Sequence, residues 1–220
     1  MDLAALRLSA LLSALTTLLL LAIGLPIAYW LTTTRRRWKV LVEAIVALPI
    51  VLPPTVLGFY LLVAFGPRSP LGRGFVAVTG HTLAFSFEGL LLASVLYSLP
   101  FAVQPFAVAL GRVDPRLVEA SFTLGESRLQ TFRRVSLPLA LPGVLAGAVL
   151  SFAHTLGEFG VVLMVGGNVP GVTRTLSISI YDAVEQLDYA AAGKTSLLLL
   201  AVSFTVLVLT YALQRRSLLA

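Results

Sequence analysis

Five long apolar stretches limit what this chain can fold into. Each approaches or exceeds the roughly 18 to 20 residues that a helix needs to cross the hydrocarbon of a bilayer. Only 12% of the 220 residues are charged, about half of the roughly 25% typical of a soluble domain. The sequence therefore predicts an all-α polytopic membrane protein, with residues 1–220 forming one transmembrane domain. The predicted spans are Leu11–Leu31, Val42–Phe65, Leu83–Val103, Leu137–Leu156 and Ser196–Leu213.

One other apolar stretch and the first predicted span need a separate interpretation. The run Phe159–Gly167 is too short and too rich in glycine to span, so we predict a re-entrant or interfacial segment. Arg7 before the first span is also found in signal peptides, but that span is too long and Arg35–Arg37 follows it as a stop signal. We therefore expect the first span to remain as a membrane anchor.

The cations predict how the spans are oriented. Eleven of the 16 Lys and Arg residues follow the first, third and fifth spans, and the remaining five lie on the other side. The side richer in cations faces the cytoplasm, which puts the amino terminus outside and the carboxyl terminus inside. The richer group is Arg35, Arg36, Arg37, Lys39, Arg112, Arg116, Arg128, Arg133, Arg134, Arg215 and Arg216; the other is Arg7, Arg68, Arg73, Arg174 and Lys194.

Several classes of function find no support in the sequence. The net charge of +6 is not accompanied by a basic face or an aromatic RNA-binding motif. Without cysteine there is no thiolate metal site or cysteine nucleophile. His81 and His154 are the only histidines and do not form H-E-x-x-H. We predict no catalytic, cofactor-binding or metal-binding residues, and a membrane-embedded enzyme is the least favoured class.

Prolines interrupt two of the predicted spans. The segment PIVLPPTV, from Pro49 to Val56, has three prolines in six positions, and each removes a backbone donor. Such a break survives at membrane depth where neighbouring helices or a water-lined path satisfy the freed carbonyls. A tolerated kink is the simpler interpretation. Pro138 and Pro142 repeat the feature in the fourth span, so the sequence predicts two broken helices, which is typical of a transport path.

A polar segment separates the third and fourth spans. Asp114 and Pro115 are an N-cap and a first helical residue, and Gly125 predicts a left-handed stop. Ser127 and Gln130 then form a capping box for a second helix. We expect an amphipathic helix, a glycine turn and a second helix on the cytoplasmic surface. The residues predicted to share the apolar face are Leu117, Val118, Ser121 and Leu124. Lipid headgroups and a groove in another protein remain alternative partners for it.

The same segment resembles a known family. Inner-membrane permeases of bacterial binding-protein-dependent ABC transporters carry the signature E-A-A, three residues, G, nine residues, [IV]-x-L-P. The spacing is intact here, with serine in place of the second alanine. In that family this segment is a coupling helix that lies in a groove of the ATP-binding subunit. The resemblance therefore implies that seven residues couple to an ATPase: Glu119, Ala120, Ser121, Leu124, Gly125, Leu137 and Pro138.

Two further segments resemble the molybdate permease branch of that family. They are GEFGVVLMVGGN, from Gly157 to Asn168, and PGVTRTLSISIY, from Pro170 to Tyr181. Sulfate permeases are similar, usually with tyrosine in place of Phe159. The resemblance implies a permease that moves an oxyanion, molybdate first and sulfate or tungstate as alternatives, across the bacterial inner membrane. It also implies a homodimer, a separate ATPase and an external oxyanion-binding protein.

The chain lacks the G-x-x-x-x-G-K-[ST] loop that cradles ATP phosphates, so we expect no ATPase activity of its own. A self-contained channel or secondary transporter is the alternative outside the family; it would not need the coupling signature, and its flux would continue without ATP.

A last set of residues are candidates for the pore or its gate: Pro53, Pro54, Ser151, Glu158 and Phe159. An acid near a span is a functional hypothesis by default. A carboxylate is a poor ligand for an oxyanion, so a structural or gating role is favoured for Glu158. In the last external loop, Arg174 is the only strong anion donor, and pairing with a nearby acid is its alternative role. The acids there, Asp182, Glu185 and Asp188, are expected to be solvated.

Overall fold

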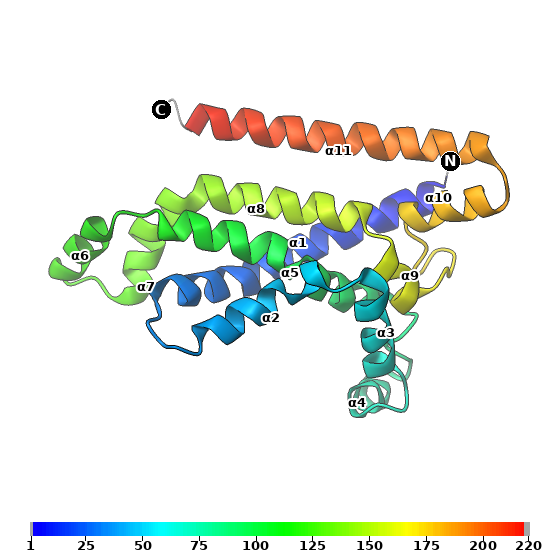
Figure 1. The fold of residues 1–220 in the computed structure, drawn as a ribbon, viewed down its shortest axis with the longest axis horizontal. Coiled ribbons are helices and arrows are strands. Elements are labelled where there is room, and N and C mark those ends of the chain that lie inside the picture. Colours follow the sequence, from blue (N-terminus) through cyan, green and yellow to red (C-terminus); the bar gives the residue numbers. More distant parts are fainter. Residues whose placement is uncertain (1, 218–220) are drawn as a thin grey trace.

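The computed structural model describes residues 2–217, and every regular element in this part of the chain is helical (Figure 1). The all-α fold is therefore confirmed. The helices are α1 (Leu3–Thr33), α2 (Lys39–Val51), α3 (Pro54–Phe65), α4 (Pro70–Thr79), α5 (Phe87–Gly111), α6 (Pro115–Thr123), α7 (Arg128–Thr131), the π-helical turn η1 (Phe132–Ser136), α8 (Leu137–Gly157), α9 (Gly160–Gly166), α10 (Leu176–Glu185) and α11 (Tyr189–Ser217).

Four helical segments are long and apolar enough to cross a membrane: Leu3–Thr33, Phe87–Gly111, Arg128–Gly157 and Tyr189–Val208. They correspond to the first, third, fourth and fifth predicted spans. The second predicted span is the bent pair α2–α3, whose two helices meet at an angle of 111°. Counting this pair gives five. Since α2 alone rises only about 20 Å at 1.5 Å per residue, the second span does not cross as one straight helix.

Helix α5 forms the centre of the bundle and packs against α1 and α8, which also contact each other. Small residues allow the close approach of α5 and α8. A Cβ atom on Gly143 would lie 2.5 Å from Ala109 Cβ, and one on Gly147 would lie 2.7 Å from the Phe106 ring. Because membrane helices associate through close packing rather than hydrophobic exclusion, these glycines set the α5–α8 distance. Phe106 itself is fully buried in this core.

The prediction of a break in the fourth span is wrong. Pro142 lies inside α8, and the helix runs without interruption from Arg128 to Gly157. Directly before Pro138, the π-helical turn shifts the backbone register, and the Leu137 N–H bonds to the Phe132 carbonyl five residues back. A π turn is one of the local adjustments by which a membrane helix accommodates proline.

The break in the second span is present, and α9 packs beside it. Helix α2 ends at Val51, and Pro54 begins α3, which projects sideways from the bundle (Figure 1). Helix α9 packs on α3 and α5, with Val161, Val162 and Val165 fully buried. The structure therefore favours a segment held inside the protein over an interfacial one.

The two groups of loops separated by the cation count lie at opposite ends of the bundle (Figure 1). The α1–α2 turn, α6, α7 and the end of α11 lie at the left end. The start of α1, α9 and α10 lie toward the right end. The predicted separation of the cation-rich loops from the others therefore has a counterpart in the fold.

Candidate functional site

The α6–α7 segment projects from one end of the bundle (Figure 1), and local hydrogen bonds build it. The Asp114 side chain caps α6 by accepting from the Arg116 N–H, with Pro115 as the first helical residue. Ser127 and Gln130 form the reciprocal capping box of α7, with the Ser127 N–H donating to Gln130 Oε1 at 2.8 Å. Both predicted helix starts are confirmed. Since each cap satisfies donors that a helix start leaves free, the segment keeps this shape without burial.

Gly125 joins the two helices in the left-handed conformation, with a φ of +85°. Its N–H donates to the Phe122 carbonyl at 3.0 Å, and the Glu126 N–H donates to the Ser121 carbonyl at 3.2 Å. This pair of bonds is the Schellman motif. The predicted turn is therefore confirmed, and the positive φ explains why the position suits glycine.

The seven predicted coupling residues divide by burial. Ser121 is buried, and its hydroxyl hydrogen-bonds the Thr131 hydroxyl at 3.0 Å, which ties α6 to α7. Leu137 is half-buried where α8 begins, next to the exposed Pro138. The others, Glu119, Ala120, Leu124 and Gly125, are exposed.

The apolar surface of this segment differs from the single helical face that the sequence predicted. Ser121 faces inward, whereas Leu124 follows the last residue of α6 and is 85% exposed. Leu117, Phe122 and Leu129 are also exposed. Together with Leu124 these three residues form what we call the α6–α7 apolar surface. In the single chain, this surface has no partner among the described residues.

The break at Pro53 and Pro54 lies against α9, where two glycines allow close contact. A Cβ atom on Gly160 would lie 2.7 Å from Pro54 Cβ, and one on Gly58 would lie 2.7 Å from Met164 Cβ. Neither position leaves room for a side chain, so α3 and α9 pack in close contact. Pro54 therefore contacts the start of α9, the helix that follows the other break at Glu158.

A chain of polar groups crosses from α5 to α8. Ser98 Oγ lies 2.9 Å from His154 Nδ1 and 2.9 Å from Thr155 Oγ1. The Thr155 hydroxyl donates to the Ser151 carbonyl at 2.9 Å, so Ser98 donates to Thr155 and accepts from His154. The His154 ring stacks on Phe101 with centroids 3.8 Å apart. His154 is thus a packed residue whose hydrogen bond to α5 helps to align two helices.

Sequence reasoning missed this link because nothing along the chain pairs position 98 with position 154. The Ser151 hydroxyl, a candidate pore donor, is fully buried and donates to the Gly147 carbonyl of its own helix at 2.8 Å. In this conformation it has no free donor to offer an anion.

Glu158 lies where α8 ends and α9 begins, and it is only 5% exposed. Neither carboxyl oxygen has a hydrogen-bond partner among the residues that the structure describes. The Ser94 hydroxyl of α5 is likewise buried and has no hydrogen-bond partner among these residues. The next residue, Phe159, is half-buried and packs on Tyr181 with ring centroids 5.0 Å apart. A buried acid without a partner is costly, so Glu158 is a candidate for a functional residue.

The loop before α10 is held by a network of charged and polar side chains. Arg174 pairs with Asp182 at 2.8 Å and donates to the Asn168 side-chain oxygen at 2.6 Å. Asn168 in turn donates to the Asp182 carboxylate. Of the two roles weighed for Arg174, the structure therefore supports pairing with an acid rather than service as an open anion donor.

Comparison with known proteins identifies the family. Residues 5–218 match the model of the family described as "Binding-protein-dependent transport system inner membrane component". The chain belongs to this family. It is thus a multi-pass inner-membrane transport component, as the resemblance of its signature implied.

Its relatives include the molybdenum transport system permease proteins ModB of Azotobacter vinelandii and Escherichia coli strain K12. The first is 51% identical over 214 residues, covering 97% of this chain and 95% of the relative. The second is 37% identical over 203 residues, covering 92% and 88%. The sulfate transport system permease protein CysT of Salmonella typhimurium is 35% identical over 193 residues, covering 88% and 69%.

Solved structures agree with the fold. The MetNI methionine ABC transporter aligns over 98% of this chain and 95% of its own, with a TM-score of 0.77 at 19% identity. A bacterial ABC transporter that imports alginate aligns over 97% and 79%, with a TM-score of 0.79 at 16% identity. At these identities the likeness concerns the fold alone.

Proposed function

We propose that this chain is the permease subunit of a molybdate importer that is driven by a separate ATPase. The observation that carries the proposal is the likeness, over nearly the whole length of both chains, to molybdenum permeases. An oxyanion-binding protein on the outer side delivers the substrate, and two copies of this chain form the pore between them. Sulfate is the second candidate substrate because a sulfate permease is also a relative.

The α6–α7 apolar surface is the proposed docking element for the ATPase. Leu117, Leu124 and Leu129 are exposed at the tip of a segment whose own backbone groups are already hydrogen-bonded. A rigid helix with an exposed apolar surface suits docking in a groove of another protein. Glu119 and Ala120 lie exposed on the same helix. Gly125 sets the angle between the two helices.

Residues near the two backbone breaks are the proposed gate: Pro53, Pro54, Ser151, Glu158 and Phe159. The α3–α9 contact at Pro54 and Gly160 links the two breaks, so a shift of one moves the other. The helices α5 and α8 carry no Lys or Arg, and the pore therefore holds the anion only weakly. Selectivity between molybdate and sulfate then resides in the binding protein.

We further propose that the amino terminus faces outward and the carboxyl terminus faces the cytoplasm, from the distribution of cations over the two ends. Single-cysteine variants test this without background because the natural chain has no cysteine. An impermeant maleimide added to intact cells should label Ser69→Cys and leave Arg36→Cys and Gln130→Cys unmodified. Labelling of Arg36→Cys would contradict the five-span orientation.

The substrate is tested with the permease, its ATPase and the binding protein reconstituted in liposomes. We expect ATP-dependent uptake of molybdate, with sulfate transported at least about tenfold less efficiently, a difference of about 1.4 kcal/mol. Preferred uptake of sulfate would favour the second candidate. Uptake that continues without ATP would instead indicate a channel or secondary transporter and would contradict the proposal.

A further inference from the structure

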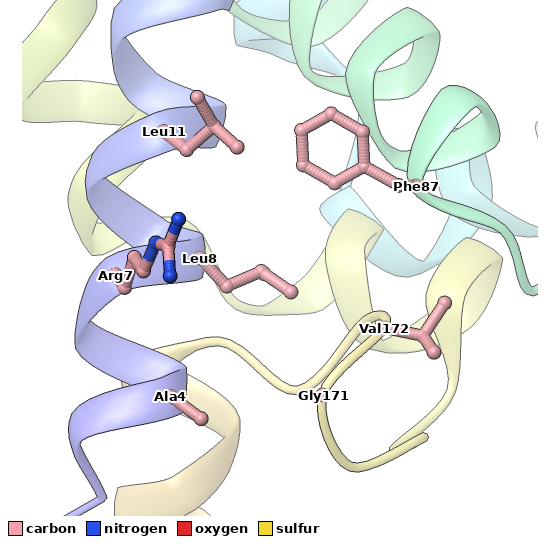
Figure 2. A pocket seen from close by; sticks show the side chains of 7 residues that line it. All are labelled: Ala4, Arg7, Leu8, Leu11, Phe87, Gly171 and Val172. Carbon is pink, nitrogen blue, oxygen red and sulfur yellow. The ribbon is translucent and has the colours of Figure 1, made fainter.

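A cleft of about 470 Å³ opens between α1, the start of α5 and the loop before α10. Figure 2 shows Leu8 and Leu11 of α1 on one side and Phe87 of α5 across from them. The backbone at Gly171 and the Val172 side chain close a third side. The volume falls in the range of about 300–1,000 Å³ that is typical of small-molecule sites. Apart from Arg7, every lining residue is apolar.

Arg7 is the one charged residue of this cleft, and its guanidinium lies beside the apolar walls (Figure 2). It is exposed, and none of the three ion pairs found within residues 2–217 includes it. Glu88, next to Phe87 in sequence, forms none of these pairs either. The site therefore has an uncompensated positive charge beside an apolar slot.

The depth of Arg7 along α1 matches the headgroup region of a bilayer. At 1.5 Å per residue, the apolar run Leu11–Leu31 extends about 30 Å, the thickness of the hydrocarbon core. Arg7 precedes that run by one helical turn, which places it about 6 Å beyond the hydrocarbon. Leu8 and Leu11 lie at the boundary itself. The Arg7 charge is thus at the level of lipid phosphates, and the apolar walls of the cleft are at the level of the upper acyl chains.

We propose that this cleft binds one phospholipid with an anionic headgroup, such as phosphatidylglycerol, from the outer leaflet. The Arg7 guanidinium presents a planar set of N–H donors that suits phosphate oxygens, and it binds the lipid phosphate. Leu8, Leu11 and Phe87 contact the acyl chain. Because Arg7 is positive and no acid of the described residues lines the cleft, a headgroup with a net negative charge is favoured over a zwitterionic one. The bound lipid joins α1 to the Gly171–Val172 loop, beside the direct bond from the Leu176 N–H to Ser9 Oγ at 2.8 Å.

The test is native mass spectrometry of the solubilised permease–ATPase complex titrated with phosphatidylglycerol, phosphatidylethanolamine or phosphatidylcholine. We expect saturable binding of one phosphatidylglycerol per permease chain, with the other two lipids binding more weakly. Arg7→Gln should weaken phosphatidylglycerol binding at least about tenfold, as expected for the loss of a charge-assisted contact. The matched control is Arg73→Gln, which removes an exposed cation of α4 outside the cleft and should leave binding unchanged. Equal affinity in the Arg7→Gln variant and the natural chain would overturn the proposal.

A second pair of variants tests the cleft without changing Arg7. Val172→Asp puts a carboxylate on the loop side of the cleft and should also weaken phosphatidylglycerol binding. Val78→Asp, at an exposed valine of α4, should not. Undiminished binding in Val172→Asp would contradict the assignment. Displacement of the lipid by millimolar phosphate or molybdate would also contradict it, because the site would then be one for free oxyanions.

Discussion

The α6–α7 segment at one end of the bundle and the Glu158 site in its interior treat polar groups in opposite ways. In the exposed segment, caps and the Gly125 turn satisfy the helix ends locally, while its apolar side chains are left open. At Glu158 the apolar groups are packed, and a carboxyl and the Ser94 hydroxyl are left without partners. The first region has a locally complete backbone structure and an exposed apolar surface, as expected of the proposed docking element. The second is an internal site that stays incomplete in this conformation, as expected of a part that moves.

The largest effect is expected from Gly125→Val. A β-branched residue in the left-handed region costs roughly 1–2 kcal/mol, so the turn should open and the α6–α7 apolar surface should lose its shape. Uptake should fall more than tenfold, as measured in reconstituted liposomes, while the Tm of the permease changes little.

The matched control for that variant is Gly74→Val. Gly74 lies in α4 with open space around it and no positive φ, so its replacement should leave uptake unchanged. Normal uptake in Gly125→Val would break the assignment of the turn as the coupling element.

The next effect separates two serines of α5 that are both fully buried. Ser98→Ala removes hydrogen bonds to His154 and Thr155 and should lower the free energy of unfolding by about 1–3 kcal/mol. Ser94→Ala removes a hydroxyl that has no partner and should cost almost nothing. Thermal unfolding of both variants in one detergent measures the difference. Equal losses of unfolding free energy in the two variants would show that the hydrogen bonds of Ser98 contribute no measurable stability, and would contradict the prediction.

A smaller effect, of the opposite sign, is expected from Glu158→Gln. This change keeps the size of the side chain and replaces a buried, unpartnered carboxyl with a group that cannot ionise, so stability should rise by about 1 kcal/mol at a pH at which the carboxyl is ionised. For a chain of this length, that corresponds to an increase in Tm of about 2–4 °C. Uptake should fall at the same time if Glu158 belongs to the gate. A lower Tm in Glu158→Gln would show that the carboxyl stabilises the fold. The Glu158 site would then not differ from the α6–α7 segment in leaving a polar group unsatisfied.

The sequence predicted the exposed region well because its structure is local. Asp114, Gly125 and the Ser127–Gln130 pair each act over three or four residues, and each adopts the predicted conformation. Long-range pairing was harder to predict. The bond between Ser98 and His154 joins residues 56 positions apart, and no pattern along the chain marks it.

The prolines show the same limit. The break at Pro53 and Pro54 was predicted because consecutive prolines remove neighbouring donors. The continuity of α8 past Pro142 was not predicted, since it depends on the π-helical turn before Pro138. The α6–α7 apolar surface was expected on one helical face, but Leu124 lies beyond the end of α6. These details depend on backbone adjustments that residue types alone do not specify.

The central claim is that the α6–α7 apolar surface docks on the ATPase, and protection of a single cysteine tests it most directly. Leu124→Cys and Val78→Cys place thiols at side chains that are 85% and 87% exposed, on α6–α7 and on α4. Maleimide labelling of each solubilised variant is compared with and without the ATPase subunit. We predict that the ATPase slows labelling of Leu124→Cys at least about tenfold, as expected for a buried interface residue, and leaves Val78→Cys unchanged. Equal labelling of Leu124→Cys in a complex that is shown to have assembled would contradict the claim.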